Sequence, residues 1–174
     1  DIHNKKYYDF LSAYSAVNQG HCNEKILETF IKQAKKLTLT SRAFYNSELG
    51  SSLEYITEVF GYDKMLPMNS GAEAVEAAIK ICRKWGYEIK NVENNKAKIL
   101  VCNGNFHGRT TTVVSFSSHH GSKENFGPLT TGFEIIEYNN ITELESRLIN
   151  DKNIVGFLVD PIQGEGGVVV PDDG

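Results

Sequence analysis

Short apolar segments alternate with helical patterns along this chain, and that alternation is the feature that most constrains its fold. Apolar residues at three- and four-residue spacing indicate helices, and short continuous apolar runs indicate buried strands. Four segments have the length and composition of strands: residues 64–68, 98–102, 134–138 and 154–159. Strands that alternate with helices build crossover units, so we predict an α/β fold with a mainly parallel sheet. Ligands of such sheets collect beyond the carboxyl ends of the strands.

The predicted helices lie before and between these strands. Helical spacing covers residues 23–37, 47–60, 72–85 and 142–149, and helix is favoured over strand in the Thr-rich segment 109–117. Asn23 and Thr142 are expected N-caps, with Glu145 as the capping-box partner of Thr142, and Gly61 is expected just past the end of the second helix. A further strand is predicted over residues 6–17, and residues 118–132 are expected to form a mobile surface loop.

Charge and cysteine content exclude several classes of function. The 174 residues carry a formal net charge of −4, with no run of Lys and Arg that would suggest nucleic-acid binding. No segment reaches the roughly 20 apolar residues needed to cross a bilayer. Cys22, Cys82 and Cys102 are far apart and predict reduced thiols in an intracellular protein, for which we expect a cytoplasmic location. The expected partner is a small neutral or anionic metabolite.

The first candidate site motif is Asn69–Ala74, between an expected strand and an expected helix. Free backbone N–H groups and the positive end of the helix dipole would meet there, and Ser70 adds a hydroxyl, so a phosphate could be held. The pattern is neither a Walker A loop nor a dinucleotide-binding fingerprint, which disfavours ATP and NAD. An ordinary serine N-cap beside a glycine would explain the same residues.

The second motif, Gly104–Arg109, follows the strand at 98–102. Two glycines bracket Phe106 and His107, which could present a flat aromatic face to a ring. Arg109 could make a bidentate contact with a carboxylate. Loop packing and a solvated charge are the simpler alternatives.

The third motif closes the strand at 154–159 with Asp160 and a glycine turn that carries Glu165. A carboxylate at the end of a buried strand needs a partner, because an unpaired buried charge is costly. A simple glycine turn with a solvated Glu165 is the alternative. The coincidence of three unusual motifs at expected strand ends favours a binding site.

These three motifs, in this order and spacing, resemble the class III aminotransferases, which are pyridoxal 5'-phosphate enzymes of fold type I. Further matches extend the resemblance from Asp9 to Gly174 and are most similar to the ornithine aminotransferases of that family: FLSAYSAVNQGHC at 10–22, LTLTSRAFY at 37–45, LPMNSGAEA at 66–74, RKWGY at 83–87, NFHGRT at 105–110 and PIQGEGGVVVP at 161–171. The resemblance implies that residues 43–174 form the first part of the large cofactor-binding domain. Residues 1–42 would belong to a small N-terminal domain and its connecting helix.

The resemblance also implies roles for single residues. Cofactor-binding positions are Ser70, Gly71 and Ala72 at the phosphate, Phe106 on the pyridine ring with His107 beside it, and Asp160, where relatives usually have Glu. Arg109 would hold a substrate carboxylate, and Glu165 would pair with an arginine further along the chain. Tyr14 would favour ornithine. No metal site is expected.

The family's Schiff-base lysine and the aspartate that pairs with the pyridinium nitrogen would lie beyond Gly174, so no catalytic residue is expected here and the isolated chain should be inactive. The implied reaction converts L-ornithine and 2-oxoglutarate to glutamate 5-semialdehyde and L-glutamate, in a homodimer. Alternatives are a class III enzyme for acetylornithine or 4-aminobutyrate, or an inactive phosphate-ligand-binding protein if the natural chain ends at Gly174. The mitochondrial matrix is the alternative compartment.

Overall fold

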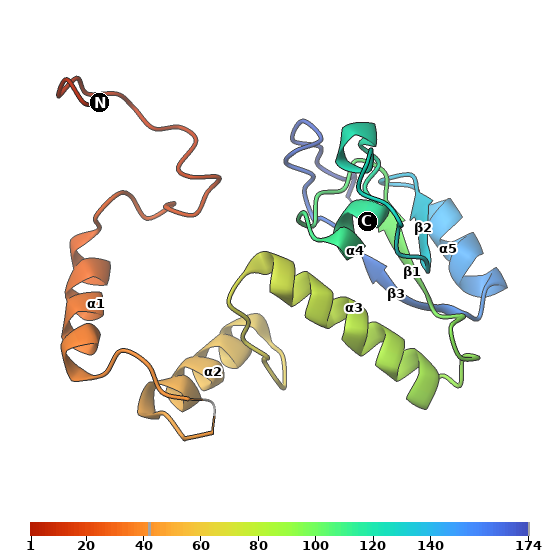
Figure 1. Ribbon diagram of the computed structural model, residues 1–174, viewed down its shortest axis with the longest axis horizontal. Helices are drawn as coiled ribbons and strands as arrows, with labels where there is room; N and C mark the ends of the chain where they lie inside the picture. The colour runs from red at the N-terminus through yellow and green to blue at the C-terminus, as the bar shows by residue number, and fades with distance from the viewer. Residues whose placement is uncertain (42, 174) are drawn as a thin grey trace. The chain divides into compact units, whose positions relative to one another are not determined.

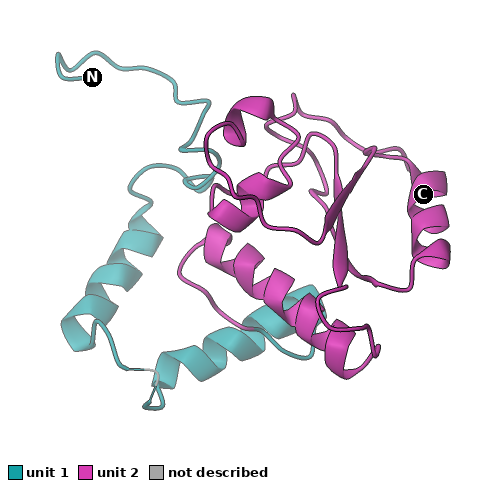
Figure 2. Ribbon diagram, turned by 45° about the vertical axis from the view of Figure 1, so that its right-hand side comes forward, with its two compact units in different colours: residues 1–65 teal, residues 66–174 magenta. Residues whose placement is uncertain are grey.

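The computed structural model describes residues 1–41 and 43–173. It forms two compact units, Asp1–Met65 and Leu66–Gly174, which are coloured separately in Figure 2. The sequence predicts a domain boundary between residues 42 and 43, and Arg42 itself lies outside the described residues. A division by contacts within this chain does not define the domains of a longer protein, so the 1–42 and 43–174 assignment stays a prediction.

The second unit is built on a three-stranded parallel sheet. Its strands are β1 (Lys98–Cys102), β2 (Phe133–Ile136) and β3 (Ile154–Leu158), in the order β2-β1-β3 (Figure 1). Both pairings of β1 are parallel, which places the carboxyl ends of all three strands at one edge. The α/β fold and three of the four strands that flank the expected helices are confirmed.

Helices cover both faces of this sheet. The helices are α3 (Gly71–Glu88), α4 (Thr111–Ser115) and α5 (Ile141–Asn150), with a short 3-10 helix η1 (His120–Ser122) after α4. Ile99 and Val101 of β1 pack with α3 and α4, whereas Leu100 and Cys102 pack towards α5. Because side chains alternate along a strand, β1 is buried on both faces and joins two hydrophobic clusters.

Glycine allows α3 to approach β3 closely. A Cβ on Gly86 would collide with Val155, and a Cβ on Gly156 would come within 2.9 Å of the sulfur of Cys82. The Val155 side chain of β3 therefore occupies the space beside Gly86 on the surface of α3.

At the opposite edge from the strand carboxyl ends, Lys98 of β1 forms ion pairs with Glu134 of β2 and with Asp151, which precedes β3. Its ammonium lies 2.6 Å from the carboxylate of Glu134 and 2.8 Å from that of Asp151. These contacts raise the pKa of Lys98 and lower that of Asp151, since each charge favours the ionised form of the other.

The first unit contains α1 (Glu24–Lys36) and α2 (Ser47–Phe60). Asn23 and Asn46 cap their N-termini, and Gly61 ends α2 in the left-handed conformation with φ 70°, as predicted for Asn23 and Gly61. Neither helix contains a buried residue. Several of their apolar side chains are exposed, such as Phe30 in α1 and Val59 in α2.

Three local predictions are wrong. Residues 6–17 form no strand, and residues 12–17 form turns: Asp9 accepts hydrogen bonds from the N–H groups of Leu11 and Ser12, and Ser12–Ser15 all have positive φ. This local side-chain capture overrides the alternating pattern. Residues 64–68 also lack strand structure; Pro67 has no N–H to donate, and the described sheet pairs only β2, β1 and β3.

The cap of α5 lies two residues before the predicted Thr142. Asn140 accepts the N–H of Glu143, and the Glu143 carboxylate reaches back to the Asn140 amide and the Glu137 N–H. Asn140 is the better cap because its side-chain carbonyl reaches the free N–H groups from this position.

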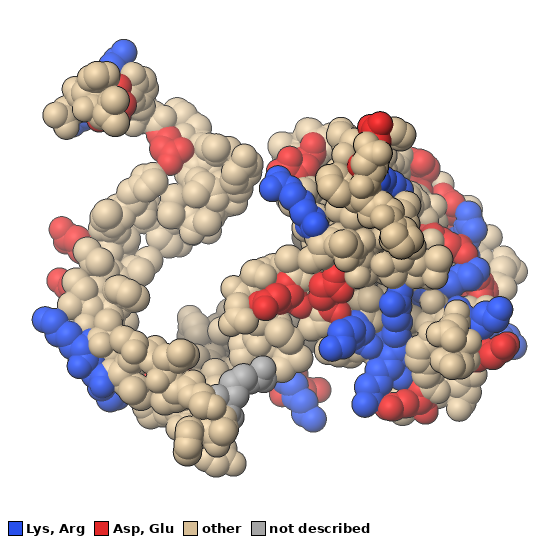
Figure 3. Space-filling view, in the orientation of Figure 1, with Lys and Arg blue, Asp and Glu red and all other residues tan. Residues whose placement is uncertain are grey.

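Surface charge agrees with the absence of a basic stripe in the sequence. On the face shown in Figure 3, Lys and Arg are interspersed with Asp and Glu over the second unit. In the described part of the chain, no helix has the length and apolar character of a membrane span.

Candidate functional site

Hydrogen bonds of buried Asn105 hold the loop that follows β1, whereas the side chain of Phe106 in this loop is exposed. The side-chain amide of buried Asn105 donates to the carbonyl oxygens of Cys102, at 2.6 Å, and Phe116, at 3.2 Å. The Gly104 N–H donates to the hydroxyl of Ser118 at 2.8 Å. Phe106 remains 45% exposed, so its ring is available to a ligand.

Asp160 at the end of β3 supports the same loop. One carboxylate oxygen accepts the backbone N–H of Phe106 at 3.3 Å, and the other lies 3.7 Å from Nδ1 of His107. The hydroxyl of Tyr138 donates to the carbonyl oxygens of Asp160 and Pro161, both at 3.1 Å. The Phe106 N–H and the His107 ring are therefore the partners of the Asp160 carboxylate at this strand end.

His107 has a buried side chain. Its side chain is 6% exposed and packs beside Phe116, with the ring centres 6.0 Å apart. Burial lowers the pKa of the imidazole below its usual value, and the Asp160 carboxylate and the Leu158 backbone only partly oppose this. Nε2 has no hydrogen-bond partner among the described residues.

The N-terminus of α3 has the donors that a phosphate group needs. The Ser70 hydroxyl accepts the Glu73 N–H at 3.2 Å, and the Glu73 carboxylate turns back to the Asn69 N–H at 2.9 Å. The N–H groups of Gly71 and Ala72 have no acceptor within the described chain. A Cβ on Gly71 would meet nothing within 4 Å, so the approach to these donors is open. The geometry fits an anion at a helix N-terminus.

This helix terminus adjoins the aromatic loop. A Cβ on Gly108 would lie 3.5 Å from Cβ of Ala72, and the Thr110 hydroxyl donates to the Glu76 carboxylate at 2.6 Å. The three predicted motifs therefore meet at the carboxyl ends of β1 and β3: Ala72 touches the loop that Asp160 supports.

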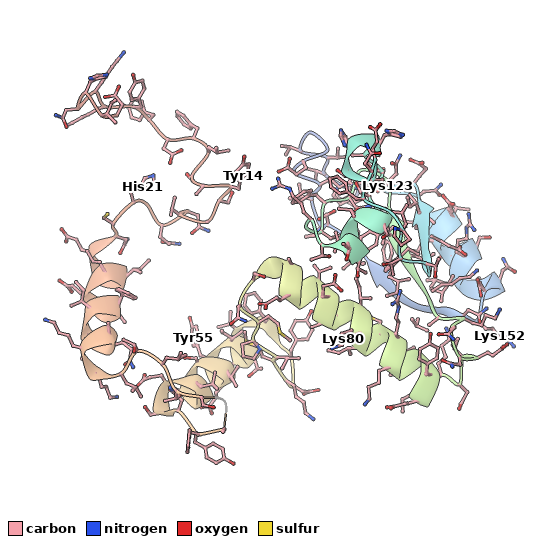
Figure 4. The ribbon with its side chains drawn as sticks, viewed as in Figure 1. Tyr14, His21, Tyr55, Lys80, Lys123 and Lys152 are labelled. Carbon is pink, nitrogen blue, oxygen red and sulfur yellow. The ribbon has the colours of Figure 1, made fainter. Side chains whose placement is uncertain are left out.

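Arg109 and Glu165 are both exposed. The Arg109 guanidinium lies 5.6 Å from the centre of the Phe106 ring. Glu165 is exposed in a turn closed by paired hydrogen bonds between Gln163 and Val169. Tyr14 belongs to the other unit, in the segment before α1 (Figure 4).

The loop after α4 also contributes to the site. A cavity of about 310 Å³ is lined by Phe106, His107 and Arg109 on one side and by Ser122 and Phe126 on another. Sequence reasoning assigned residues 118–132 to a surface loop and missed this contribution. The aromatic Phe126 within an otherwise polar segment was the available signal.

Lysines lie elsewhere in the described chain. Lys80 extends from α3, Lys123 follows η1 and Lys152 follows α5 (Figure 4), and the cavity beside Phe106 is lined by no lysine. Among the described residues no group of three or more His, Cys, Asp or Glu could hold a metal ion.

Comparisons with known proteins agree with this arrangement. The family model of the class III aminotransferases matches residues 1–174. The chain is 56% identical to the mitochondrial ornithine aminotransferase of Drosophila ananassae over 100% of this chain and 40% of that protein. It is 55% identical to the ornithine aminotransferase of Plasmodium falciparum over 99% of this chain and 42% of that protein.

Solved structures give the same result for the fold. The ornithine aminotransferase of Toxoplasma gondii ME49 superposes with a TM-score of 0.97 at 48% identity, over 100% of this chain and 41% of that one. The acetylornithine aminotransferase of Elizabethkingia anophelis has a TM-score of 0.83 at 59% identity, over 100% and 42% of the two chains. The chain spans about 40% of the length of the curated relative from Drosophila ananassae. The matched residues include those that meet at the N-terminus of α3 and in the Phe106 loop. Because the family model matches the full chain, this chain belongs to the class III aminotransferases.

Proposed function

We propose that this chain is part of an ornithine δ-aminotransferase, which converts L-ornithine and 2-oxoglutarate to glutamate 5-semialdehyde and L-glutamate. Class III aminotransferases use pyridoxal 5'-phosphate, and relatives of this chain are named ornithine aminotransferases. The observation that carries the proposal is the meeting of the α3 N-terminus with the Phe106 loop, through Gly108 and Ala72. It offers phosphate donors and an exposed aromatic face within one site.

The residues of this chain would act by binding and positioning. Ser70, Gly71 and Ala72 would hold the phosphate through a hydroxyl and two N–H groups. Phe106 would lie against the pyridine ring, held by the hydrogen bond from its N–H to Asp160. The bound cofactor supplies an electron sink that lets an amino group be transferred.

Two charged residues would handle the substrates. Arg109 is exposed beside the Phe106 ring, where its planar fork can bind a substrate carboxylate. Exposed Glu165 would neutralise an arginine further along the protein when ornithine is bound, and release it when a second carboxylate arrives with glutamate. An arginine left unpaired would favour glutamate over ornithine.

The second candidate is an acetylornithine aminotransferase, which is favoured by the 59% identity to the enzyme of that name from Elizabethkingia anophelis. A 4-aminobutyrate aminotransferase is a related alternative. We prefer ornithine because Glu165 and Tyr14 match the residues expected for it. A catalytically inactive protein that binds a phosphorylated ligand is the alternative from a different class.

The test uses the natural full-length protein that contains this sequence. Purified protein is incubated with 2-oxoglutarate and either L-ornithine, N-acetylornithine or 4-aminobutyrate, and glutamate formation is measured with and without added pyridoxal 5'-phosphate. The proposal expects cofactor-dependent activity with the highest kcat/KM for ornithine. Preference for N-acetylornithine would favour the second candidate, and a protein that binds no cofactor and stays inactive would contradict the family activity.

Assembly and location are part of the same proposal. We expect a homodimer, supported by apolar residues such as Phe30 and Ile31 that α1 leaves exposed. Light scattering of the full-length protein would test this. Four relatives carry the word mitochondrial in their names. For this protein a cytoplasmic location stays the prediction, with the mitochondrial matrix as the alternative, and subcellular fractionation would distinguish them.

A further inference from the structure

Gln163 is a buried polar residue to which the sequence patterns assign no role. Its exposure is 4%, although it lies between the exposed residues Ile162 and Gly164. Its side-chain amide donates a 2.7 Å hydrogen bond to the carbonyl oxygen of Asn103, at the end of β1. One side chain therefore ties the segment after β3 to the start of the loop that carries Phe106 and Arg109.

Two glycines make room for this amide. A Cβ on Gly104 would come within 2.8 Å of Oε1 of Gln163, and the φ of +76° at this position also favours glycine. A Cβ on Gly166 would lie 3.5 Å from the same oxygen and 3.4 Å from the carbonyl oxygen of Gly104. The Gln163 side chain fills the space between the Glu165 turn and the loop after β1.

The backbone of Gln163 fixes the base of the Glu165 turn. Its N–H donates to the Val169 carbonyl at 3.0 Å, and the Val169 N–H returns a bond to the Gln163 carbonyl at 2.9 Å. Glu165 lies at the exposed tip of this turn. The same residue therefore closes the turn that carries Glu165 and binds Asn103, at the start of the loop that carries Arg109.

We infer that Gln163 is a positioning residue that holds the Glu165 turn in register with the Phe106–Arg109 loop, and thereby sets the preference between ornithine and glutamate. The consequence for substrates rests on the proposed function. The anchoring itself rests only on the contacts of Gln163. Loss of its one strong hydrogen bond should change the ratio of rates for the two amino donors by about three- to tenfold.

The experiment compares Gln163→Met with the wild type in the full-length protein. Methionine keeps the length and packing of the side chain and removes the amide. Gln33→Met is the matched control, because Gln33 also donates from Nε2 to a backbone carbonyl, that of Leu37 at 2.9 Å, at the end of α1. Single-turnover rates with ornithine and with glutamate give the donor ratio. Hydrogen exchange of the 163–169 segment in cofactor-free protein reports on the turn directly.

The expected result is an altered donor ratio and faster exchange of residues 163–169 in Gln163→Met, with neither change in Gln33→Met. Gln163→Glu is a second variant in case the first does not fold. Its ionised carboxylate cannot donate to Asn103, whereas its neutral acid can. Its donor ratio relative to wild type should therefore return towards one as the pH is lowered.

Unchanged ratio and exchange in the Gln163 variants, or an equal change in Gln33→Met, would overturn the inference. A wild-type protein inactive towards both donors would instead overturn the proposed function. The exchange comparison would then still decide whether Gln163 anchors the turn.

Discussion

The guanidinium carbon of Arg109 lies 5.6 Å from the centre of the Phe106 ring, so the cation rests against the aromatic side chain. An exposed cation–π contact contributes about 0.5 to 1 kcal/mol. A hydrogen bond to a charged group contributes about 1.5 to 3 kcal/mol, so a substrate carboxylate can draw Arg109 from the ring. The Phe106 ring thus stabilises Arg109 only weakly, so that the guanidinium can still leave the ring to bind a substrate carboxylate.

Replacing Arg109 with lysine should weaken substrate binding and leave the cofactor bound. Lysine keeps the charge but loses the planar fork that matches a carboxylate. We expect kcat/KM to fall about 10- to 150-fold, which corresponds to the loss of about 1.5 to 3 kcal/mol. Steady-state kinetics with both substrates and the visible absorbance of the cofactor provide the measurement. Unchanged kinetics would make Arg109 a solvated surface charge.

Glu165→Ala should raise the activity towards glutamate relative to ornithine. Without this carboxylate, the arginine supplied from the rest of the protein would stay free to bind a second substrate carboxylate. The ratio of single-turnover rates should change by about tenfold, equivalent to about 1.4 kcal/mol. Exposed Glu93 offers a control, since Glu93→Ala should leave the ratio unchanged. A Glu165→Ala ratio within about twofold of wild type would remove the switch role, being well under that 1.4 kcal/mol.

Buried His107 should make the protein less stable in mild acid. Its pKa is lowered in the folded state, mainly by burial, so below a pH of about 6.5 the unfolded chain binds more protons. Stability therefore falls as the pH drops through and below that value. Melting temperatures in this pH range should fall less steeply for His107→Gln than for wild type. His120→Gln should keep the wild-type slope, because that side chain is 90% exposed.

Lys98→Met should destabilise the sheet. The variant leaves Glu134 and Asp151 without the ammonium between them. Partly exposed ion pairs contribute about 0.2 to 1 kcal/mol each, so a loss of about 1 kcal/mol is expected from denaturant unfolding. Lys152→Met, at an exposed position two residues before β3, should have a smaller effect. Equal losses in the two variants would show that the Lys98 pairs add nothing.

Gly86→Ala should destabilise the protein because its Cβ would collide with Val155. Overpacking of this kind costs about 1 to 3 kcal/mol. Gly50→Ala is the matched control within α2, where a Cβ would meet nothing within 4 Å and alanine should be about 0.5 to 1 kcal/mol better than glycine. Thermal unfolding of both variants would separate contact from helix propensity. If Gly86→Ala were more stable than the wild type, β3 would be able to move away from α3 at little cost in free energy.

The strands and helices of the second unit were predictable where local pattern and burial agree. Residues 98–102 form a continuous apolar run because β1 is covered on both faces, and α3 shows helical spacing and a serine cap. The run at 64–68 has the same local character but gains no strand partner, and pairing is a tertiary property that no local pattern contains. At Asp9, a turn stabilised by the side chain outweighs the alternation of apolar residues.

The candidate site was predictable as three separate motifs but not as a connected structure. Phe106 and Arg109 are visible as unusual residues in a glycine-bracketed loop. The supporting contacts join residues far apart in the chain, such as Gln163 with Asn103 and Asp160 with Phe106. Gln163 carries no signal in the sequence, because its burial depends on β1 and β3 lying side by side.

The placement of β1 at the centre of the sheet has a consequence for biosynthesis. β1 leaves the ribosome before either neighbour, since β2 and β3 both follow it in the chain. The backbone N–H and C=O groups on both edges of β1 stay unpaired, and its two apolar faces stay uncovered, until the later residues have been synthesised. Until Leu158 has emerged, the nascent chain exposes a segment prone to wrong pairing, which is the kind of segment that chaperones bind during synthesis.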